Sequence, residues 1–220
     1  MKNLYVFALV DHAPAPFSAA GHRIEFIEAE GVYAAVARIR RAPAVTEGAL
    51  RAQHEVVEQI ANRVQAVLPA RFGALVEAQE LERVVFQRRT AIQEALALVL
   101  GRRQMTARLL AVAAAPALAD SVLSRAVSGT EYLEGRRAAA SPPLPSALAG
   151  LASAVRSYLV AERAEGSRGR VLATVYHLID QCDVEAYRAA AAPVERAVHD
   201  STLTISGPWA PFAFGPDLWA

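Results

Sequence analysis

The sequence predicts an α+β protein of two domains. Short apolar runs typical of strands lie near the N-terminus, longer segments repeat apolar residues at helical spacing, and the composition changes to Ala-, Ser- and Pro-rich near the middle. We expect an N-terminal α+β domain over 1–115, a mixed sheet with helices on it and ferredoxin-like in character. A connecting segment over 116–145 and a smaller, helix-rich α+β domain over 146–220 with an aromatic tail follow.

Three strands are expected before the first helix. Leu4–Val10 is a nearly continuous apolar run, typical of a strand covered on both faces. It imitates a secretory signal, but it is short, rich in β-formers and stops at Asp11, which favours a buried strand. The segments 24–27 and 32–39 flank Glu30-Gly31, and this spacing predicts two strands joined by a tight turn.

Two amphipathic helices and two strands complete the expected N-terminal domain. Apolar residues recur at three- and four-residue steps from Leu50 to Leu68, which predicts a helix that ends before Pro69. The segment 70–76 is a short strand candidate, and 79–100 predicts a second helix with Gly101 as a left-handed cap. Residues 105–112 are expected to return as a strand.

Fewer strands are expected in the second half of the chain than in the first. After the SPPLP segment at 141–145, residues 148–159 form a helical stripe and 166–169 a turn. Residues 171–179 predict a strand, 184–198 a helix and 203–205 a last short strand. The chain then reads GPWAPFAF over 207–214, where Pro208 and Pro211 exclude a helix interior or a central strand.

Composition limits the classes of function and partner that are expected. With 23 Lys and Arg against 22 Asp and Glu, the net charge of +1 gives no electrostatic case for a nucleic-acid partner, and the scattered arginine pairs are interpreted as solvated faces. The single cysteine, Cys182, excludes an internal disulfide and fits a reducing cytosol. No run approaches the roughly 18 apolar residues of a membrane span, so a soluble protein without a membrane partner is expected.

Motifs for catalysis, metal or cofactor binding are not found. The sequence lacks the zinc His-Glu-x-x-His pair, the phosphate-binding and dinucleotide-binding glycine patterns and the Gly-x-Ser-x-Gly elbow. Its five histidines are dispersed, and His54, beside the apolar face of the first helix, is expected to be structural. An alternative is a ligand-binding or enzymatic α+β protein with an interdomain site, for which His54, Arg71 and His177 are the polar candidates.

Three segments carry a resemblance to a known family. LPARFGAL at 68–75, GTEYLEGRR at 129–137 and GPWAPFAF at 207–214 are similar, in order and spacing, to signatures of the gas vesicle GvpF/GvpL family. The resemblance covers essentially the whole chain. The sequence departs from the family pattern at several positions, among them Gln104, where a glutamate is common, and Ala210, where a proline is usual.

The resemblance implies a non-enzymatic, cytoplasmic, gas vesicle associated protein that acts in gas vesicle assembly. Its implied partners are the hydrophobic shell protein GvpA and other accessory Gvp proteins, with no cofactor and no small-molecule substrate. A chaperone-like role is physically sensible, because a subunit with an apolar face aggregates unless that face is held until incorporation. An exposed sheet edge of the N-terminal domain is the expected binding surface.

The residues of the motifs are expected to be structural. Pro69 stops the helix, Arg71 holds carboxylates or carbonyls at the turn, Phe72 enters the core and Gly73 permits a close backbone approach. In the tail that begins at Gly207, the rings at 209, 212 and 214 are expected to seal the interface between the domains as a hydrophobic clasp, with Pro208 and Pro211 keeping the segment extended. The alternative is that Trp209, Phe212 and Phe214 form a partner-binding patch.

Overall fold

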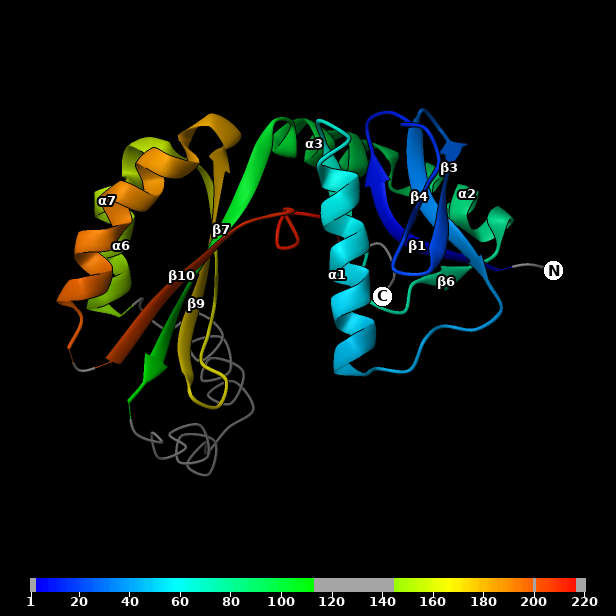
Figure 1. Ribbon diagram of the computed structural model, residues 1–220. Coiled ribbons are helices and arrows are strands. Elements are labelled where there is room, and N and C mark those ends of the chain that lie inside the picture. Colours follow the sequence, from blue (N-terminus) through cyan, green and yellow to red (C-terminus); the bar gives the residue numbers. More distant parts are fainter. Residues whose placement is uncertain (1–2, 113–144, 200, 217–220) are drawn as a thin grey trace, which may run out of the picture. The chain divides into compact units, whose positions relative to one another are not determined.

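The computed structural model describes residues 3–112, 145–199 and 201–216. It is an α+β structure, as predicted (Figure 1). The elements, in chain order, are β1 (Asn3–Val10), β2 (Phe17–Ala19), β3 (His22–Ala29), β4 (Val32–Ile39), α1 (Glu47–Ala61), β5 (Val67–Pro69), β6 (Leu75–Val76), α2 (Ala78–Gln87), α3 (Arg89–Val99), β7 (Arg102–Ala111), α6 (Ser146–Val155), η1 (Arg156–Tyr158), β8 (Leu159–Glu165), β9 (Val171–Asp180), η2 (Gln181–Asp183), α7 (Val184–Ala197) and β10 (Ser201–Trp209).

The chain forms two compact units. Unit 1 comprises Met1–Gln104 and Trp209–Ala220, and unit 2 comprises Met105–Pro208. This division differs from the predicted boundaries at both ends of unit 2, because β7 pairs with β9 and β10 in the second sheet and the tail after Pro208 packs on unit 1. The predicted connecting segment lies, apart from Pro145, outside the described residues, as does the motif at 129–137.

The sheet of unit 1 has the strand order β2-β3-β4-β1-β5, and β6 also pairs with β1. Each of these pairings is antiparallel, so the prediction of a mixed sheet is wrong. For two of the pairings the reason is local: two-residue turns at Ala20-Gly21 and Glu30-Gly31, with positive φ at all four residues, join β2 to β3 and β3 to β4, and strands joined by so short a turn can pair only antiparallel. The second of these turns was predicted.

Strand β1 is buried on both faces, which confirms the prediction from its continuous apolar run. Tyr5 and Phe7 belong to a core cluster with Val56, Val57 and Ile60 of α1. Alternate β1 residues and the buried side chains of α2 and α3 are not members of that cluster, which places these two helices over the opposite face. Leu81, Val85, Ile92, Leu96 and Val99 are the buried residues of α2 and α3.

Two helix boundaries differ from the prediction. Helix α1 begins after Thr46, whose hydroxyl caps it by accepting from the Ala49 amide at 3.2 Å, but the helix ends at Ala61. Residues 67 and 68, predicted as the end of this helix, instead belong to β5 and pair with β1. The predicted helix 79–100 is two helices that meet at Arg88, whose φ of −110° and ψ of 12° are not helical.

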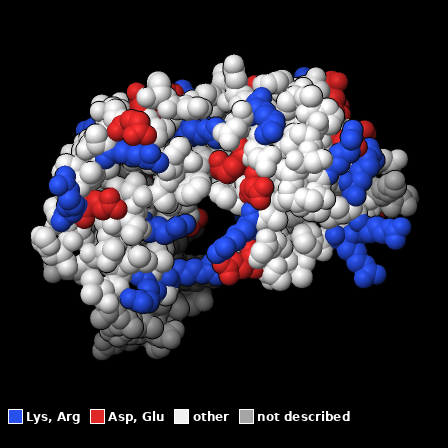
Figure 2. All heavy atoms as spheres, viewed as in Figure 1, with Lys and Arg blue, Asp and Glu red and all other residues white. Residues whose placement is uncertain are grey.

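Unit 2 is a four-stranded sheet in the order β10-β7-β9-β8, with α6 and α7 side by side on one of its faces (Figure 1). Leu159, predicted in a helical stripe, begins strand β8. The last strand, β10, is longer than predicted and carries Pro208 near its end. Because β10 lies at the edge of the sheet, it tolerates a proline, whose missing amide hydrogen costs no hydrogen bond to a neighbouring strand. On the face drawn in Figure 2, basic and acidic side chains are interspersed among uncharged residues.

Candidate functional site

Two of the signature segments meet on helix α1 within unit 1. In the first, Pro69 ends β5 and the Ala70 amide donates to the Phe7 carbonyl oxygen at 2.8 Å. The chain then turns through Gly73 at a φ of 89°, a conformation that a glycine adopts without strain. The Val6 amide donates to the Ala74 carbonyl oxygen at 2.8 Å, so backbone bonds to β1 lie on both sides of the turn.

A buried polar network ties this turn to α1. The Tyr5 hydroxyl donates to Gln53 Oε1 at 2.5 Å, and Gln53 Nε2 donates to the Ala70 carbonyl oxygen at 3.1 Å. The Gly73 amide in turn donates to the Tyr5 hydroxyl oxygen at 3.1 Å. Burial raises the pKa of Tyr5, and the Gly73 amide partly opposes this shift, so the hydroxyl stays protonated and keeps donating to Gln53.

The C-terminal tail is fixed to the same helix through its backbone. The Ala210 amide donates to Glu58 Oε1 at 2.7 Å, and the Ala213 amide donates to Gln104 Oε1 at 2.8 Å. Ala210 and Phe214 are fully buried. A Cβ atom on Gly215 would lie 3.9 Å from the Pro69 carbonyl oxygen, so the end of the tail reaches the first signature segment.

The aromatic rings of the tail are buried to different extents. Phe214 is 2% exposed and Phe212 is 39% exposed. The His54 ring stacks on Phe212 with centroids 5.7 Å apart and meets Trp209 edge-on at 5.1 Å. His54 therefore packs between two tail rings, and the only core anchor among the three predicted rings is Phe214.

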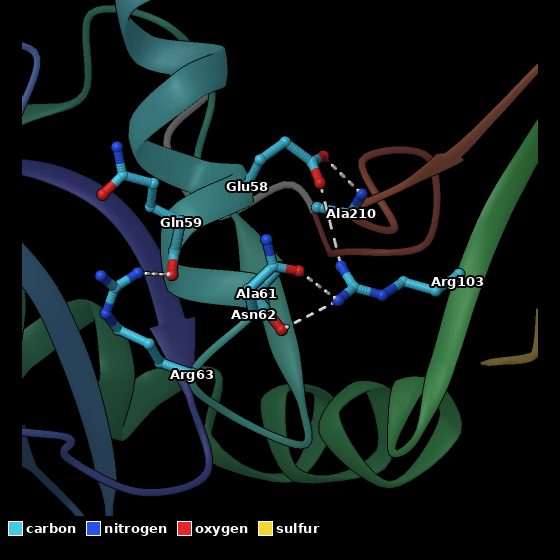
Figure 3. A network of polar contacts seen from close by, with 7 residues as sticks. All are labelled: Glu58, Gln59, Ala61, Asn62, Arg63, Arg103 and Ala210. Carbon is cyan, nitrogen blue, oxygen red and sulfur yellow. Dashed lines mark hydrogen bonds and ion pairs between the residues drawn. The ribbon is translucent and has the colours of Figure 1, made fainter.

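Arg103 forms a second polar cluster at the end of α1 (Figure 3). Its guanidinium donates to the Ala61 carbonyl oxygen at 3.1 Å and to Asn62 Oδ1 at 2.8 Å, and it pairs with Glu58 Oε2 at 3.8 Å. It thus satisfies a carbonyl that the helix end leaves without an intrahelical partner. The interpretation of Arg102-Arg103 as a solvated pair is wrong for Arg103, which is 8% exposed.

The remaining predicted residues are not gathered around one chemical centre. Arg71 is exposed, and Phe72, expected in the core, is half-buried. The Gly207 carbonyl oxygen accepts from Arg188 Nη2 at 2.5 Å within unit 2. His177, also in unit 2, lies in the core between Tyr187 and Glu162, at 2.7 Å and 3.1 Å. Burial lowers the pKa of His177 more than the Glu162 carboxylate raises it.

The contacts at the junction between α1, the 69–73 turn and the tail hold these three segments together. The polar groups of the junction are paired with backbone atoms, so they hold chain segments rather than face a substrate. Within residues 3–112, 145–199 and 201–216, no three His, Cys, Asp or Glu side chains are placed to hold a metal ion. In the same ranges no helix is long and apolar enough to cross a membrane.

Tyr5, Gln53, Glu58 and Gln104 are junction residues that the sequence analysis did not identify. Their partners lie 17 to 152 residues away in sequence, and no local pattern signals such pairings. For Gln104 the sequence did give one indication, because this residue stands where the family commonly has a glutamate. The amide oxygen that binds the Ala213 amide is an acceptor that a glutamate would also supply.

Comparisons with known proteins agree with this architecture. The family profile of the gas vesicle synthesis protein GvpL/GvpF matches residues 3–216. The structure is similar to the crystal structure of gas vesicle protein GvpF from Microcystis aeruginosa, with a TM-score of 0.73, 11% identity and coverage of 97% of this chain and 99% of that one. It is similarly close to GvpF from Anabaena sp. PCC7120, with a TM-score of 0.72, 12% identity and coverage of 98% and 99%. No curated protein sequence gives a significant match.

Proposed function

Because the chain belongs to the GvpL/GvpF family of gas vesicle synthesis proteins, we propose that it acts in gas vesicle assembly by binding the shell protein GvpA and other accessory Gvp proteins. The observation that carries this proposal is the family match over residues 3–216, which leaves no part of either unit outside the family pattern except the chain ends. The role is chaperone-like and non-enzymatic: the protein holds an aggregation-prone subunit until it is incorporated.

The binding surface we assign is an edge of the unit 1 sheet. Strand β2 pairs only with His22–Ile24 of the much longer β3. The outer edge of residues 25–29 therefore has no strand beside it in the described part of unit 1. An edge of this kind can accept an extended strand from another protein through main-chain hydrogen bonds.

The hairpin register indicates which amides point outward from this edge. Ala29 and Val32 flank the two-residue turn, so they form a hydrogen-bonded pair, and Ile27 and Glu25 follow at the next alternate positions. The amides of Phe26 and Glu28 consequently point away from β4. Glu28 is exposed, so its amide is the donor best placed for an incoming strand.

Co-purification of the tagged chain with co-expressed GvpA tests the proposal. Glu28→Pro removes the outward amide and no bond to β4, so we expect a folded variant that captures little or no GvpA. Glu28→Ala keeps the amide and is the matched control, which we expect to capture GvpA like the wild type. Capture by Glu28→Pro equal to that by Glu28→Ala would refute the edge as the binding surface, and no capture by the wild type would refute the GvpA contact.

A second comparison separates the edge from the tail. The double variant Trp209→Ala, Phe212→Ala removes the two partly exposed tail rings and leaves the Phe214 anchor in place. We expect a folded double variant to capture GvpA like the wild type. Loss of capture, with circular dichroism unchanged, would instead assign binding to the tail.

A further inference from the structure

Unit 2 carries a polar hollow on the sheet face opposite α6 and α7. Its volume is about 400 Å³, and its lining includes Arg108 of β7, Thr174 and Tyr176 of β9, Glu165 at the end of β8, and Ser167 and Arg168 of the β8–β9 connection. Met105, Ala107, Ala173 and Val175 belong to the core beneath the helices. The alternation of side chains along β7 and β9 therefore turns Arg108, Thr174 and Tyr176 to the opposite face.

The hollow is fixed by contacts at its rim. The β8–β9 connection closes through the bridge between Arg168 and Val171. Its tip is tied to β7, because the Ala111 amide donates to the Arg170 carbonyl oxygen at 3.0 Å. The lining groups are thus carried by paired strands and a closed turn, which keeps them in place before any ligand arrives.

The charges of the hollow do not cancel. Arg108 and Arg168 contribute two positive charges and Glu165 one negative charge, which leaves one net positive charge. Neither guanidinium makes a hydrogen bond or an ion pair within the described part of the chain. Glu165 accepts from the Tyr176 hydroxyl at 2.8 Å, and burial together with Glu165 raises the pKa of Tyr176 to about 12, so this hydroxyl stays protonated.

Thr174 is an independent sign of a ligand. It is 6% exposed, it lines the hollow, and its hydroxyl has no hydrogen-bond partner among the described residues. A buried hydroxyl without a partner costs free energy unless a bound group satisfies it. The Ser167 hydroxyl lines the same hollow and is likewise unpaired in the described ranges.

We propose that this hollow binds a carboxylate group, held by the guanidinium groups of Arg108 and Arg168 and by the hydroxyls of Ser167 and Thr174. A carboxylate carries the single negative charge that balances the hollow, and its planar pair of oxygens matches the donor fork of a guanidinium. The volume fits a small-molecule site. The carboxylate comes either from a free small acid or from an Asp or Glu side chain of a partner protein. The site lies in unit 2 and is separate from the β3 edge of unit 1.

The test is an NMR titration of the ¹⁵N-labelled full-length chain at low ionic strength. The probes are sodium acetate, the peptide acetyl-Ala-Glu-Ala-amide, its Gln counterpart and sodium phosphate. We expect saturable shifts with the Glu peptide and none with the Gln peptide. Arg108→Gln and Arg168→Gln should each weaken binding about tenfold or more, and Thr174→Val about threefold. Arg156→Gln removes one exposed arginine of unit 2 outside the hollow and should bind like the wild type.

The outcomes are separable. Binding of the Glu peptide alone supports a protein side chain as the source, and equal binding of acetate supports a free acid. Tighter binding of phosphate at the same residues would overturn the carboxylate assignment. The site itself would be overturned by equal shifts with the Gln peptide, by unchanged affinity in the Arg108, Arg168 and Thr174 variants, or by the absence of saturable shifts with any probe. Failure of GvpA capture leaves all of these outcomes unaffected.

Discussion

Replacement of Tyr5 by phenylalanine removes one oxygen atom from the network that ties the 69–73 turn to α1. The ring of Tyr5 is retained, and it keeps its edge contact with Phe7 at a centroid distance of 5.0 Å. The variant therefore leaves the apolar packing of the core in place. What it removes are the donor to Gln53 and the acceptor of the Gly73 amide.

The magnitude follows from the burial of the two groups that lose their partner. Gln53 is 7% exposed, so its Oε1 atom is left unsatisfied in the core, at a cost of about 1–3 kcal/mol. The Gly73 amide is half-buried, so water replaces part of its bond and the cost there is about 0.5–1 kcal/mol. The two costs together lead us to expect that Tyr5→Phe lowers the free energy of unfolding by about 1.5–4 kcal/mol.

The assay is urea denaturation of the full chain, together with hydrogen exchange at the Gly73 amide. Tyr33→Phe in the neighbouring strand β4 is the matched control: it removes the same atom from a half-buried tyrosine, whose hydroxyl makes no hydrogen bond among the described residues. We expect it to change stability by less than about 0.5 kcal/mol. Equal losses in the two variants, or unchanged exchange at Gly73 in Tyr5→Phe, would show that the network does not hold the turn.

Three further predictions concern the turn, the tail and unit 2. Gly73→Ala places a Cβ at a φ of 89° with no atom within 4 Å, so backbone strain alone should destabilise the protein by about 1–2 kcal/mol in urea denaturation. Phe214→Ala should cost about 3–5 kcal/mol and the half-exposed Phe212→Ala less than about 1.5 kcal/mol in the same assay. Burial lowers the pKa of His177 in the folded protein, whereas in the unfolded chain this histidine keeps its ordinary pKa of about 6.5. As the pH falls below about 6.5, the unfolded chain therefore binds more protons than the folded chain. Stability should be full above that pH and fall as the pH drops, with a shallower fall in His177→Gln.

The parts of the fold that were predicted are those that local chemistry decides. The β3–β4 hairpin follows from Glu30-Gly31, and the left-handed end before β7 follows from Gly101, whose φ is 68°. The break at Arg88 has no proline or glycine to signal it, so a continuous helix was predicted across it. Strand β8 was missed because an edge strand with exposed charged residues lacks the apolar run by which buried strands are recognised.

For the candidate site, the sequence identified the two signature segments but not the residues that bind them. The signatures at 68–75 and 207–214 both lie at the junction on α1, yet the atoms that hold them come from residues far away in the chain. Sequence spacing carries no information on such pairs. The same holds for Arg103, whose burial depends on the end of a helix 42 residues earlier.

The contacts of the signature segments also bear on where a partner binds. Ala210 and Phe214 are buried, and the amides of Ala210 and Ala213 are engaged with α1 and β7 side chains. The tail already uses these amides and the Phe214 ring for contacts within unit 1. It cannot use them to bind another protein unless the junction unfolds. A sheet edge differs in this respect, because the outward amides of residues 26 and 28 face no neighbouring strand in the described part of unit 1. The segments by which the family is recognised are thus suited to hold unit 1 together, which favours the β3 edge as the surface that we propose for the shell subunit.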